Sequence, residues 1–169
     1  TGVYQPETAK NMCLELLGRK RSAPCAMVEI RAEGVKELFG AQENAPARRD
    51  LVTALNVFLD TNCVIFRNSP NSLLAFFPEA PSKGRLKRKL EEAFVSVRIS
   101  MEEDPRLRLV RLIAGIIYRR EDEEARFEEM AALAGRICTI HSGEAEDTVC
   151  FGEDVSELSS GGPDINEPA

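Results

Sequence analysis

The sequence predicts an α/β (α+β) domain: a single central mixed, largely antiparallel sheet of about five strands, with helices on both faces. Two apolar runs, Cys63–Phe66 and Leu73–Phe77, flank the turn-forming segment Asn68–Ser72, a pattern typical of a β-hairpin. Helical patterns alternate with further apolar runs, as expected when helices cover a sheet. The chain of 169 residues, 43% of them hydrophobic, is long enough to bury one core.

The two hairpin runs are apolar almost throughout and do not alternate with polar residues. Strands of this composition are covered on both faces, so we expect the hairpin to lie in the middle of the sheet. Its turn then presents polar groups at the end of a buried element. The turn is therefore a candidate for a binding site, and the plain alternative is that it serves only to reverse the chain.

The first half of the chain predicts three helical segments and one strand. Pro6 lies near the start of a helix that runs to about Lys20, because proline is favoured in the first helical turn. A buried strand is expected at Ala26–Ile30 and a short helical segment at Glu33–Phe39, stopped by Gly40. A longer helix follows over Asn44–Leu59. Its apolar residues recur with helical spacing: Leu51, Val52, Leu55, Phe58 and Leu59.

The second half continues the alternation. Ser82 is a suitable N-cap for a helix with a regular apolar face. That face comprises Leu86, Leu90, Ala93, Phe94 and Val97. After a break at Asp104-Pro105, a strand is expected over Leu107–Tyr118, an acid-rich helix from Asp122, and a last strand at Thr148–Phe151. We place the domain at residues 1–153, with a disordered C-terminal tail at 154–169 because that segment has too few apolar residues to fold.

Composition excludes two classes of partner. The net charge of −6 and the pI near 5.0 argue against nucleic acid and against membrane contact by this segment, since both need a basic face. No apolar run is long enough to span a membrane. The five cysteines lack metal-binding spacing and lie in apolar stretches, as reduced core thiols of a cytoplasmic protein do. The chain begins at Thr1 without an initiator Met, so we expect an upstream part.

Several short motifs resemble those of one family. Residues 1–4 read Thr-Gly-Val-Tyr, residues 26–30 Ala-Met-Val-Glu-Ile, residues 39–40 Phe-Gly, and residues 113–116 Ile-Ala-Gly-Ile. In this order and spacing, over about residues 1–151, they resemble GGDEF domains, the diguanylate cyclase family. The resemblance implies a nucleotidyl cyclase-like fold. It also implies synthesis of cyclic di-GMP from two GTP molecules by paired domains, each holding one GTP with two Mg²⁺ ions.

The family signature, Gly-Gly-Asp/Glu-Glu-Phe, is replaced in this chain. The matching positions are Ser69, Pro70, Asn71, Ser72 and Leu73. The signature glycines let the backbone approach the nucleotide, whereas Pro70 adds a ring and lacks an N–H donor. The signature carboxylates hold hard cations, for which the neutral side chains of Asn71 and Ser72 are poor substitutes.

Other positions that the resemblance assigns to the site depart in the same direction. Glu29 stands at a metal-binding aspartate, but the second aspartate is replaced by Arg31, which puts a cation where a metal would bind. Glu37 falls nearest the position at which the family has a guanine-reading asparagine, and its carboxylate can still accept hydrogen bonds from guanine. Glu144 falls near the position at which the family has an arginine that binds the triphosphate. The structural alternative for Glu29 is a half-buried acid paired with Arg31 or Lys36.

These losses predict an inactive diguanylate cyclase homologue, because catalysis of this reaction depends on positioning and charge neutralisation. We expect a regulatory or protein-interaction domain of a larger bacterial cytoplasmic signalling protein connected with cyclic di-GMP. The partner is another protein or a second copy, and no cofactor is expected, with Mg²⁺ only if a nucleotide binds. The vestigial nucleotide site would comprise Glu29, Glu37, Ser69, Pro70, Asn71 and Ser72.

Two rival functions stay open. One is a sensor that binds GTP or cyclic di-GMP without turning it over, and the other is an enzyme with altered metal or nucleotide use. A basic helix start at Lys83–Lys89 and an acidic one at Glu121–Glu124 are either solvated faces or docking surfaces for copies or partners.

Overall fold

The computed structural model describes residues 3–34, 38–39, 42, 45–59 and 63–155, and the side chains of 58 and 59 are not described. Within this part of the chain, six strands form one open sheet in the order β1-β3-β4-β2-β5-β6. Their bounds are β1 Val3–Tyr4, β2 Cys25–Glu33, β3 Val64–Ser69, β4 Ser72–Phe77, β5 Arg111–Arg119 and β6 Thr148–Phe151. The two outermost pairings, β1 with β3 and β5 with β6, are parallel, and the inner pairings are antiparallel. The predicted fold class is confirmed.

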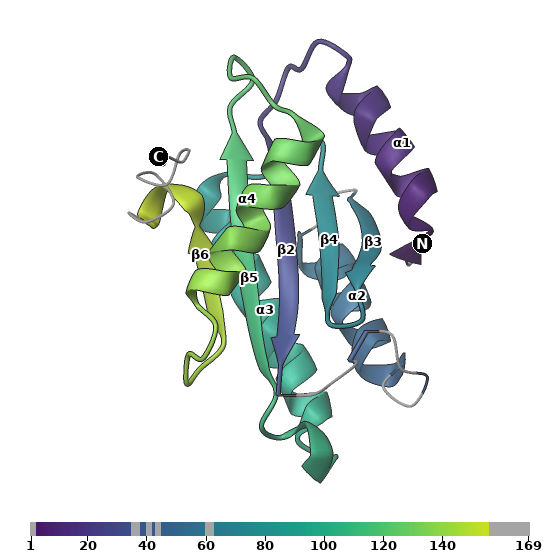
Figure 1. Cartoon of the computed structure of the whole chain (residues 1–169), viewed down its shortest axis with the longest axis vertical. Coiled ribbons are helices and arrows are strands. Elements are labelled where there is room, and N and C mark those ends of the chain that lie inside the picture. Colours follow the sequence, from purple (N-terminus) through teal and green to yellow (C-terminus); the bar gives the residue numbers. More distant parts are fainter. Residues whose placement is uncertain (1–2, 35–37, 40–41, 43–44, 60–62, 156–169) are drawn as a thin grey trace, which may run out of the picture.

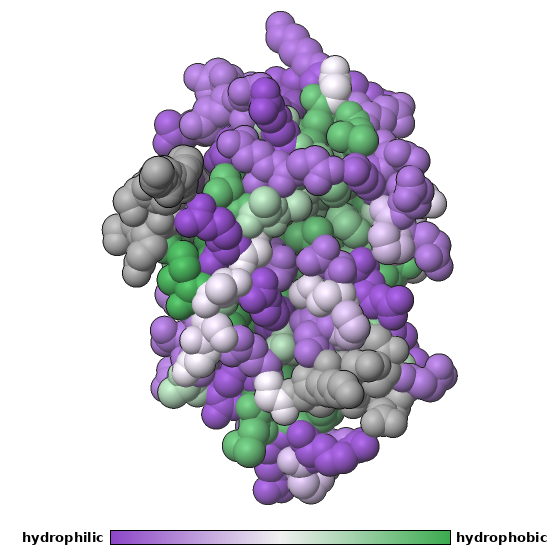
Figure 2. Space-filling view, viewed as in Figure 1, coloured by the Kyte–Doolittle hydropathy of each residue, from purple (hydrophilic) through white to green (hydrophobic). Residues whose placement is uncertain are grey.

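Helices cover both faces of this sheet. Their bounds are α1 Pro6–Leu17, α2 Ala45–Leu59, α3 Lys83–Met101 and α4 Phe127–Ile140. In Figure 1, α1 and α4 lie in front of the sheet, and α2 and α3 lie behind it. Figure 2 shows mainly polar side chains over the front face, with apolar residues visible between α1 and α4. None of the described helices is both long and apolar enough to cross a membrane.

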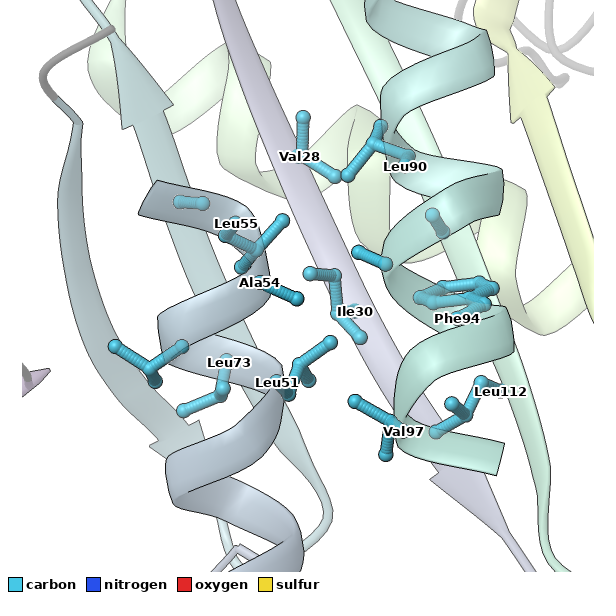
Figure 3. Close-up of a cluster of buried hydrophobic side chains, with 14 of the residues drawn as sticks. Val28, Ile30, Leu51, Ala54, Leu55, Leu73, Leu90, Phe94, Val97 and Leu112 are labelled. Atoms are coloured by element: carbon cyan, nitrogen blue, oxygen red, sulfur yellow. The ribbon is translucent and has the colours of Figure 1, made fainter. Parts of the chain in front are cut away.

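Each face of the sheet has its own core, because successive side chains of a strand point to opposite faces. Behind the sheet, Val28 and Ile30 of β2 pack with Leu51 of α2 and with Leu90 and Phe94 of α3 (Figure 3). In front, Met27 packs with buried residues of α1 and α4. Burial of each large apolar side chain contributes about 1.5–3 kcal/mol, so these two cores hold the helices on the sheet.

Strand β2 is the centre of the sheet. It pairs with β4 on one side and β5 on the other, both antiparallel. Glu29 lies opposite Leu74 and Gly115 in this register. The register therefore places Glu29 in the middle of the sheet, on the face that α4 covers.

Several predicted elements are confirmed. The hairpin lies inside the sheet as expected, and β6 has the predicted bounds. Ser82 caps α3, because its hydroxyl accepts a hydrogen bond from the Arg85 N–H at 3.4 Å. The five predicted apolar positions of α3 and three of those of α2 (Leu51, Val52 and Leu55) are buried. The other two, Phe58 and Leu59, have side chains outside the described part, as do residues 156–169 of the predicted tail.

The predicted helix at Glu33–Phe39 is wrong in its described residues. Glu33 is the last residue of β2, and Leu38 and Phe39 form a turn. Gly34, the residue after β2, has φ +99°, and a Cβ atom there would lie 2.8 Å from the carbonyl oxygen of Leu109. Only glycine fits this position, and residues 35–37 of the predicted helix lie outside the described part of the chain.

Several predicted boundaries also move, two of them by four or five residues. The last long strand starts at Arg111, not Leu107, because Asp104 caps a short 3₁₀ helix over Pro105–Leu107. Helix α4 starts at Phe127, not Asp122, because the Glu123 carboxylate accepts from the Arg120 N–H at 2.7 Å and closes a turn. Strand β1 was not predicted, since two residues give no periodic pattern.

The cysteines of this fold should react slowly. All five are free, and burial raises the pKa of Cys13, Cys63 and Cys138 to about 12 and that of Cys25 and Cys150 by less. A thiol with such a pKa has roughly a thousandth of the ordinary thiolate content at pH 8. We expect a disulfide reagent at pH 8 to label the buried Cys13 and Cys138 at least about 100-fold slower than free cysteine.

The pH dependence gives a second check on these thiols. Because the pKa values are raised, the native labelling rate should keep rising above pH 9, where free cysteine levels off. Unfolding the chain in denaturant should release all five thiols at the rate of free cysteine. Rapid labelling of Cys13 or Cys138 in the native chain would contradict the burial described here.

Candidate functional site

A cleft of about 500 Å³ lies where β2 ends beside the hairpin turn. Its volume is in the range of small-molecule sites. Its lining residues are Glu29, Arg31, Ala32, Glu33, Gly34, Asn68, Ser69, Asn71 and Ser72. The structure thus brings together four of the predicted site residues, Glu29, Ser69, Asn71 and Ser72. Pro70 is exposed on the turn but does not line the cleft, Leu73 is buried in the core, and Glu37 lies outside the described residues.

Glu29 is held by an arginine two residues along the same strand. It is 3% exposed, and its Oε2 accepts from the Arg31 Nε at 2.9 Å and lies 2.8 Å from Nη2. Both residues point to the face of β2 that α4 covers, since alternate residues of a strand share one face. The predicted pairing of Glu29 with Arg31 is confirmed.

Helix α4 completes this ion pair. Arg31 Nη2 also donates to the carbonyl oxygen of Gly135 at 3.1 Å, and Nη1 donates to Thr139 Oγ1 at 3.0 Å. A Cβ atom on Gly135 would lie only 3.1 Å from Glu29 Oε1, so α4 packs closely over the carboxylate. The guanidinium therefore bridges β2 and α4, and each of its three nitrogens contacts an oxygen of the chain.

These residues do not fit a Mg²⁺ ion. Arg31 places its positive charge against the Glu29 carboxylate, where a metal would need that oxygen. The second carboxylate of the cleft, Glu33, accepts hydrogen bonds from Ser142 Oγ and from the Gly143 N–H at 3.0 Å. Within the described residues, no three acidic, histidine or cysteine side chains gather as metal ligands.

The hairpin turn is bonded to the segment that follows β2. Asn71 Oδ1 accepts from the Leu38 N–H at 2.9 Å, and the Pro70 carbonyl accepts from the Phe39 N–H at 2.9 Å. The Asn71 carbonyl also accepts from the Ala32 N–H at 2.8 Å. Leu38 and Phe39 are buried, so this segment packs into the core beside the turn. These acceptors of the turn are thus occupied by N–H groups of the protein's own backbone.

The hydroxyl groups at the base of the turn are also engaged. Ser69 and Ser72 share a hydrogen bond of 2.9 Å between their hydroxyls. Asn68 Nδ2 donates to Ser72 Oγ at 3.2 Å, and Ser69 Oγ accepts from the Asn71 N–H at 3.2 Å. Since Pro70 has no N–H, the turn offers few free backbone donors to a phosphate group.

Replacing Asn71 with alanine tests this role of the turn. The change removes the acceptor of the Leu38 N–H, and an unpaired buried donor costs about 1–3 kcal/mol. We expect the free energy of unfolding, measured with urea, to fall by about that amount. The matched control is Asn68→Ala, an exposed residue of the same hairpin whose loss should cost less than about 1 kcal/mol. Equal effects of both changes would contradict the role given to Asn71.

The loop between α4 and β6 supplies no cation to the cleft, because residues 141–147 contain no Lys or Arg. His141 Nδ1 lies 3.6 Å from Glu144 Oε2, and Glu144 itself is exposed. Asp147 accepts from Arg98 at 2.7 Å and from the Leu112 N–H at 2.8 Å, which ties the loop to α3 and β5.

Sequence reasoning missed the residues of α4 that complete the site. Gly135 and Thr139 contact Arg31, and Cys138 Sγ lies 3.5 Å from the Glu29 carbonyl oxygen. The one available signal was a glycine inside a helix, which often marks a close approach of another group.

Comparisons with known proteins show what this arrangement resembles. No protein-family model matches the sequence, and no curated protein matches it. Solved structures do match. The GGDEF domain of DgcB from Caulobacter crescentus, solved in complex with c-di-GMP, superposes with a TM-score of 0.66 and 10% identity over 90% of this chain and 92% of that one.

Two structures from Pseudomonas aeruginosa agree. The GGDEF domain of TpbB (YfiN) gives a TM-score of 0.67 with 12% identity and 93% coverage of both chains. The diguanylate cyclase SiaD, solved with its activator SiaC, gives 0.61 with 12% identity over 88% of this chain and 58% of that one. At this identity the likeness establishes the fold, and the fold is that of a GGDEF domain.

Proposed function

We propose that this GGDEF-fold chain is catalytically inactive and works as a regulatory or protein-interaction domain of a larger bacterial protein in cyclic di-GMP signalling. The observation that carries the proposal is the ion pair between Arg31 and the buried Glu29. Its guanidinium places a fixed charge where the reaction needs an exchangeable metal. Family resemblance supplies the signalling context, and the geometry supports the loss of chemistry.

The physical reason is electrostatic. Transfer of a phosphoryl group depends on cations that bridge the phosphate oxygens, and removal of one such contributor costs about 10²-fold or more in rate. In the described part of the cleft the positive charge is that of Arg31, which Glu29 neutralises. A triphosphate needs free N–H donors at the turn, but Pro70 has none and the Asn71 N–H already donates to Ser69 Oγ. A bound GTP would therefore have neither its metal nor its phosphate contacts.

The fold remains intact while polar groups that line its cleft are engaged in internal contacts, which suits a domain that acts through its surface. SiaD, a protein of the same fold, was solved in complex with an activator protein. We propose that this chain likewise acts through contact with a protein, either another chain or a second copy of itself.

The experiment that tests the proposal measures turnover and binding separately. The purified chain is incubated with GTP and Mg²⁺ or Mn²⁺ and the products are separated, and GTP and c-di-GMP are titrated by calorimetry with and without Mg²⁺. We expect no phosphodiester product and no binding heat from a chain whose circular dichroism shows it folded. Product would establish an enzyme and overturn the proposal.

A different outcome would favour the rival function. Saturable binding of GTP or c-di-GMP at micromolar concentration, weakened in Asn71→Ala and unchanged in a control substitution at exposed Val57, would show a nucleotide sensor. The polar lining of the cleft is the feature that would then serve binding.

A further inference from the structure

The outward face of α3 carries a stripe of exposed residues that the core does not use. The stripe comprises Arg88, Glu92, Val95, Ile99 and Glu102. They are spaced alternately by four and three residues, so they lie on one side of the helix. The opposite side carries Leu86, Leu90 and Val97, which are fully buried against the sheet. Helix α3 lies behind the sheet beside α2 (Figure 1). All five stripe residues are exposed to solvent.

The centre of the stripe is apolar. Val95 is 60% exposed and Ile99 is 63% exposed, one helical turn apart. Neither side chain contributes to either core. Covering two large apolar side chains at this exposure with another surface lowers the free energy.

The charges of the stripe define which surface fits. Arg88 lies seven residues before Val95 and Glu102 lies seven residues after it, about 10 Å along the axis on each side. Their side chains make no ion pair or hydrogen bond with any part of the chain that the structure describes. By contrast, the neighbouring Lys87 pairs with Glu91 at 2.8 Å.

This spacing makes the stripe complementary to itself. When a second copy lies antiparallel along α3, with the two-fold axis at Val95, each Arg88 lies opposite Glu102 of the second copy. Val95 then contacts Val95 of the second copy. Ile99 is covered by the methylene groups of Glu92 there. Both unpaired charges gain a partner and both apolar residues leave water, which no parallel alignment of the two helices achieves.

We propose that a second copy of this chain binds along α3 through this stripe, with Arg88 and Glu102 as the symmetric ion pairs. The inference rests on the proposed function and names the partner of the interaction domain. An interface built on two apolar residues per copy is small, so the isolated chain should self-associate weakly and reversibly. A larger protein that already holds two copies together raises their effective concentration and fills the contact.

Charge exchange tests the proposal directly. The full chain is studied by sedimentation equilibrium at low salt over a wide range of concentrations, with circular dichroism as a check on folding. Arg88→Glu or Glu102→Arg alone places like charges together at both ends, and we expect each to weaken self-association by about tenfold or more. The double variant Arg88→Glu/Glu102→Arg restores opposite charges and should recover the association of the original chain.

The control is Arg136→Glu, which makes the same charge change at an exposed residue of α4, on the other face of the sheet. It should leave self-association within about twofold of the original. A chain that stays monomeric at millimolar concentration, a double variant that fails to recover, or equal weakening by Arg136→Glu would overturn the proposal. None of these results depends on the GTP assay, so failure of this contact and failure of the proposed function are distinguishable.

Discussion

Replacing Gly115 with alanine is expected to lower the free energy of unfolding by about 3 kcal/mol, at the upper end of what overpacking costs. A Cβ atom at this position would lie 2.5 Å from the carbonyl oxygen of Ala134 and 2.8 Å from the Cβ of Ile137. Both distances are far below van der Waals contact. The absence of a side chain at Gly115 is what lets α4 rest on β5.

Neither obstructing atom can move on its own. The Ala134 oxygen belongs to the helix backbone, and the Ile137 Cβ is fixed to it, so the whole of α4 must retreat. That retreat would separate Ala134 and Ile137 from the core in front of the sheet. It would also pull Gly135 away from Arg31, because the two residues are hydrogen-bonded. The loss therefore includes packing and the polar contacts of the cleft.

Gly84→Ala is the matched control for this substitution. Gly84 is the second residue of α3, and a Cβ atom there would meet nothing within 4 Å. Since alanine is the better helix former, this change should raise stability by up to about 1 kcal/mol. Urea unfolding of both variants measures the difference. A Gly115→Ala chain within about 0.5 kcal/mol of the original would contradict the close packing of α4 on β5.

Replacing Arg31 with methionine is expected to have the second large effect. It leaves the carboxylate of Glu29, 3% exposed, without its cation and beneath α4. Loss of one partner of a buried pair costs about 3–5 kcal/mol, and the partial exposure of Arg31 places the expected value near 3 kcal/mol. Urea unfolding at neutral pH is the measurement.

The double variant Glu29→Leu/Arg31→Met separates pairing from packing. It removes both charges and keeps similar side-chain volumes, so it should recover most of the stability that Arg31→Met loses. A double-mutant cycle with Glu29→Leu then gives the coupling energy of the pair. Additive effects of the two single changes would show that Glu29 and Arg31 do not depend on each other, against the structure described here.

The elements with strong local signals could be predicted from the sequence. Helix α3 combines a serine cap with apolar residues at helical spacing, and the hairpin combines two apolar runs with turn residues. Weaker local signals failed. Nothing in the sequence near Glu33 shows that β2 continues to this residue, because its pairing partner is Arg111 of β5. The turn that delays α4 depends on a single side-chain contact of Glu123.

The same division applies to the site. Loss of the signature residues at the turn is visible in the sequence, and so is Arg31 two residues after Glu29. The partners that hold Arg31 are not, because Gly135 and Thr139 are 104 and 108 residues away and reach it only through the packing of α4 on the sheet. The hydrogen bond between Asn71 and Leu38 could not be predicted either, since the two residues are 33 apart in the sequence.

The central position of β2 also sets the order in which the chain can fold as it is synthesised. Its neighbours in the sheet come much later, and β5 begins 78 residues after β2 ends. At about 5–20 residues per second, the ribosome needs roughly 4–16 s to produce that stretch. During this interval an apolar strand has emerged with an unpaired edge, which is the state most prone to wrong pairing. Strand β4 begins 39 residues after β2 ends and can pair with one edge of β2 in this interval, whereas the other edge stays open until β5 is made.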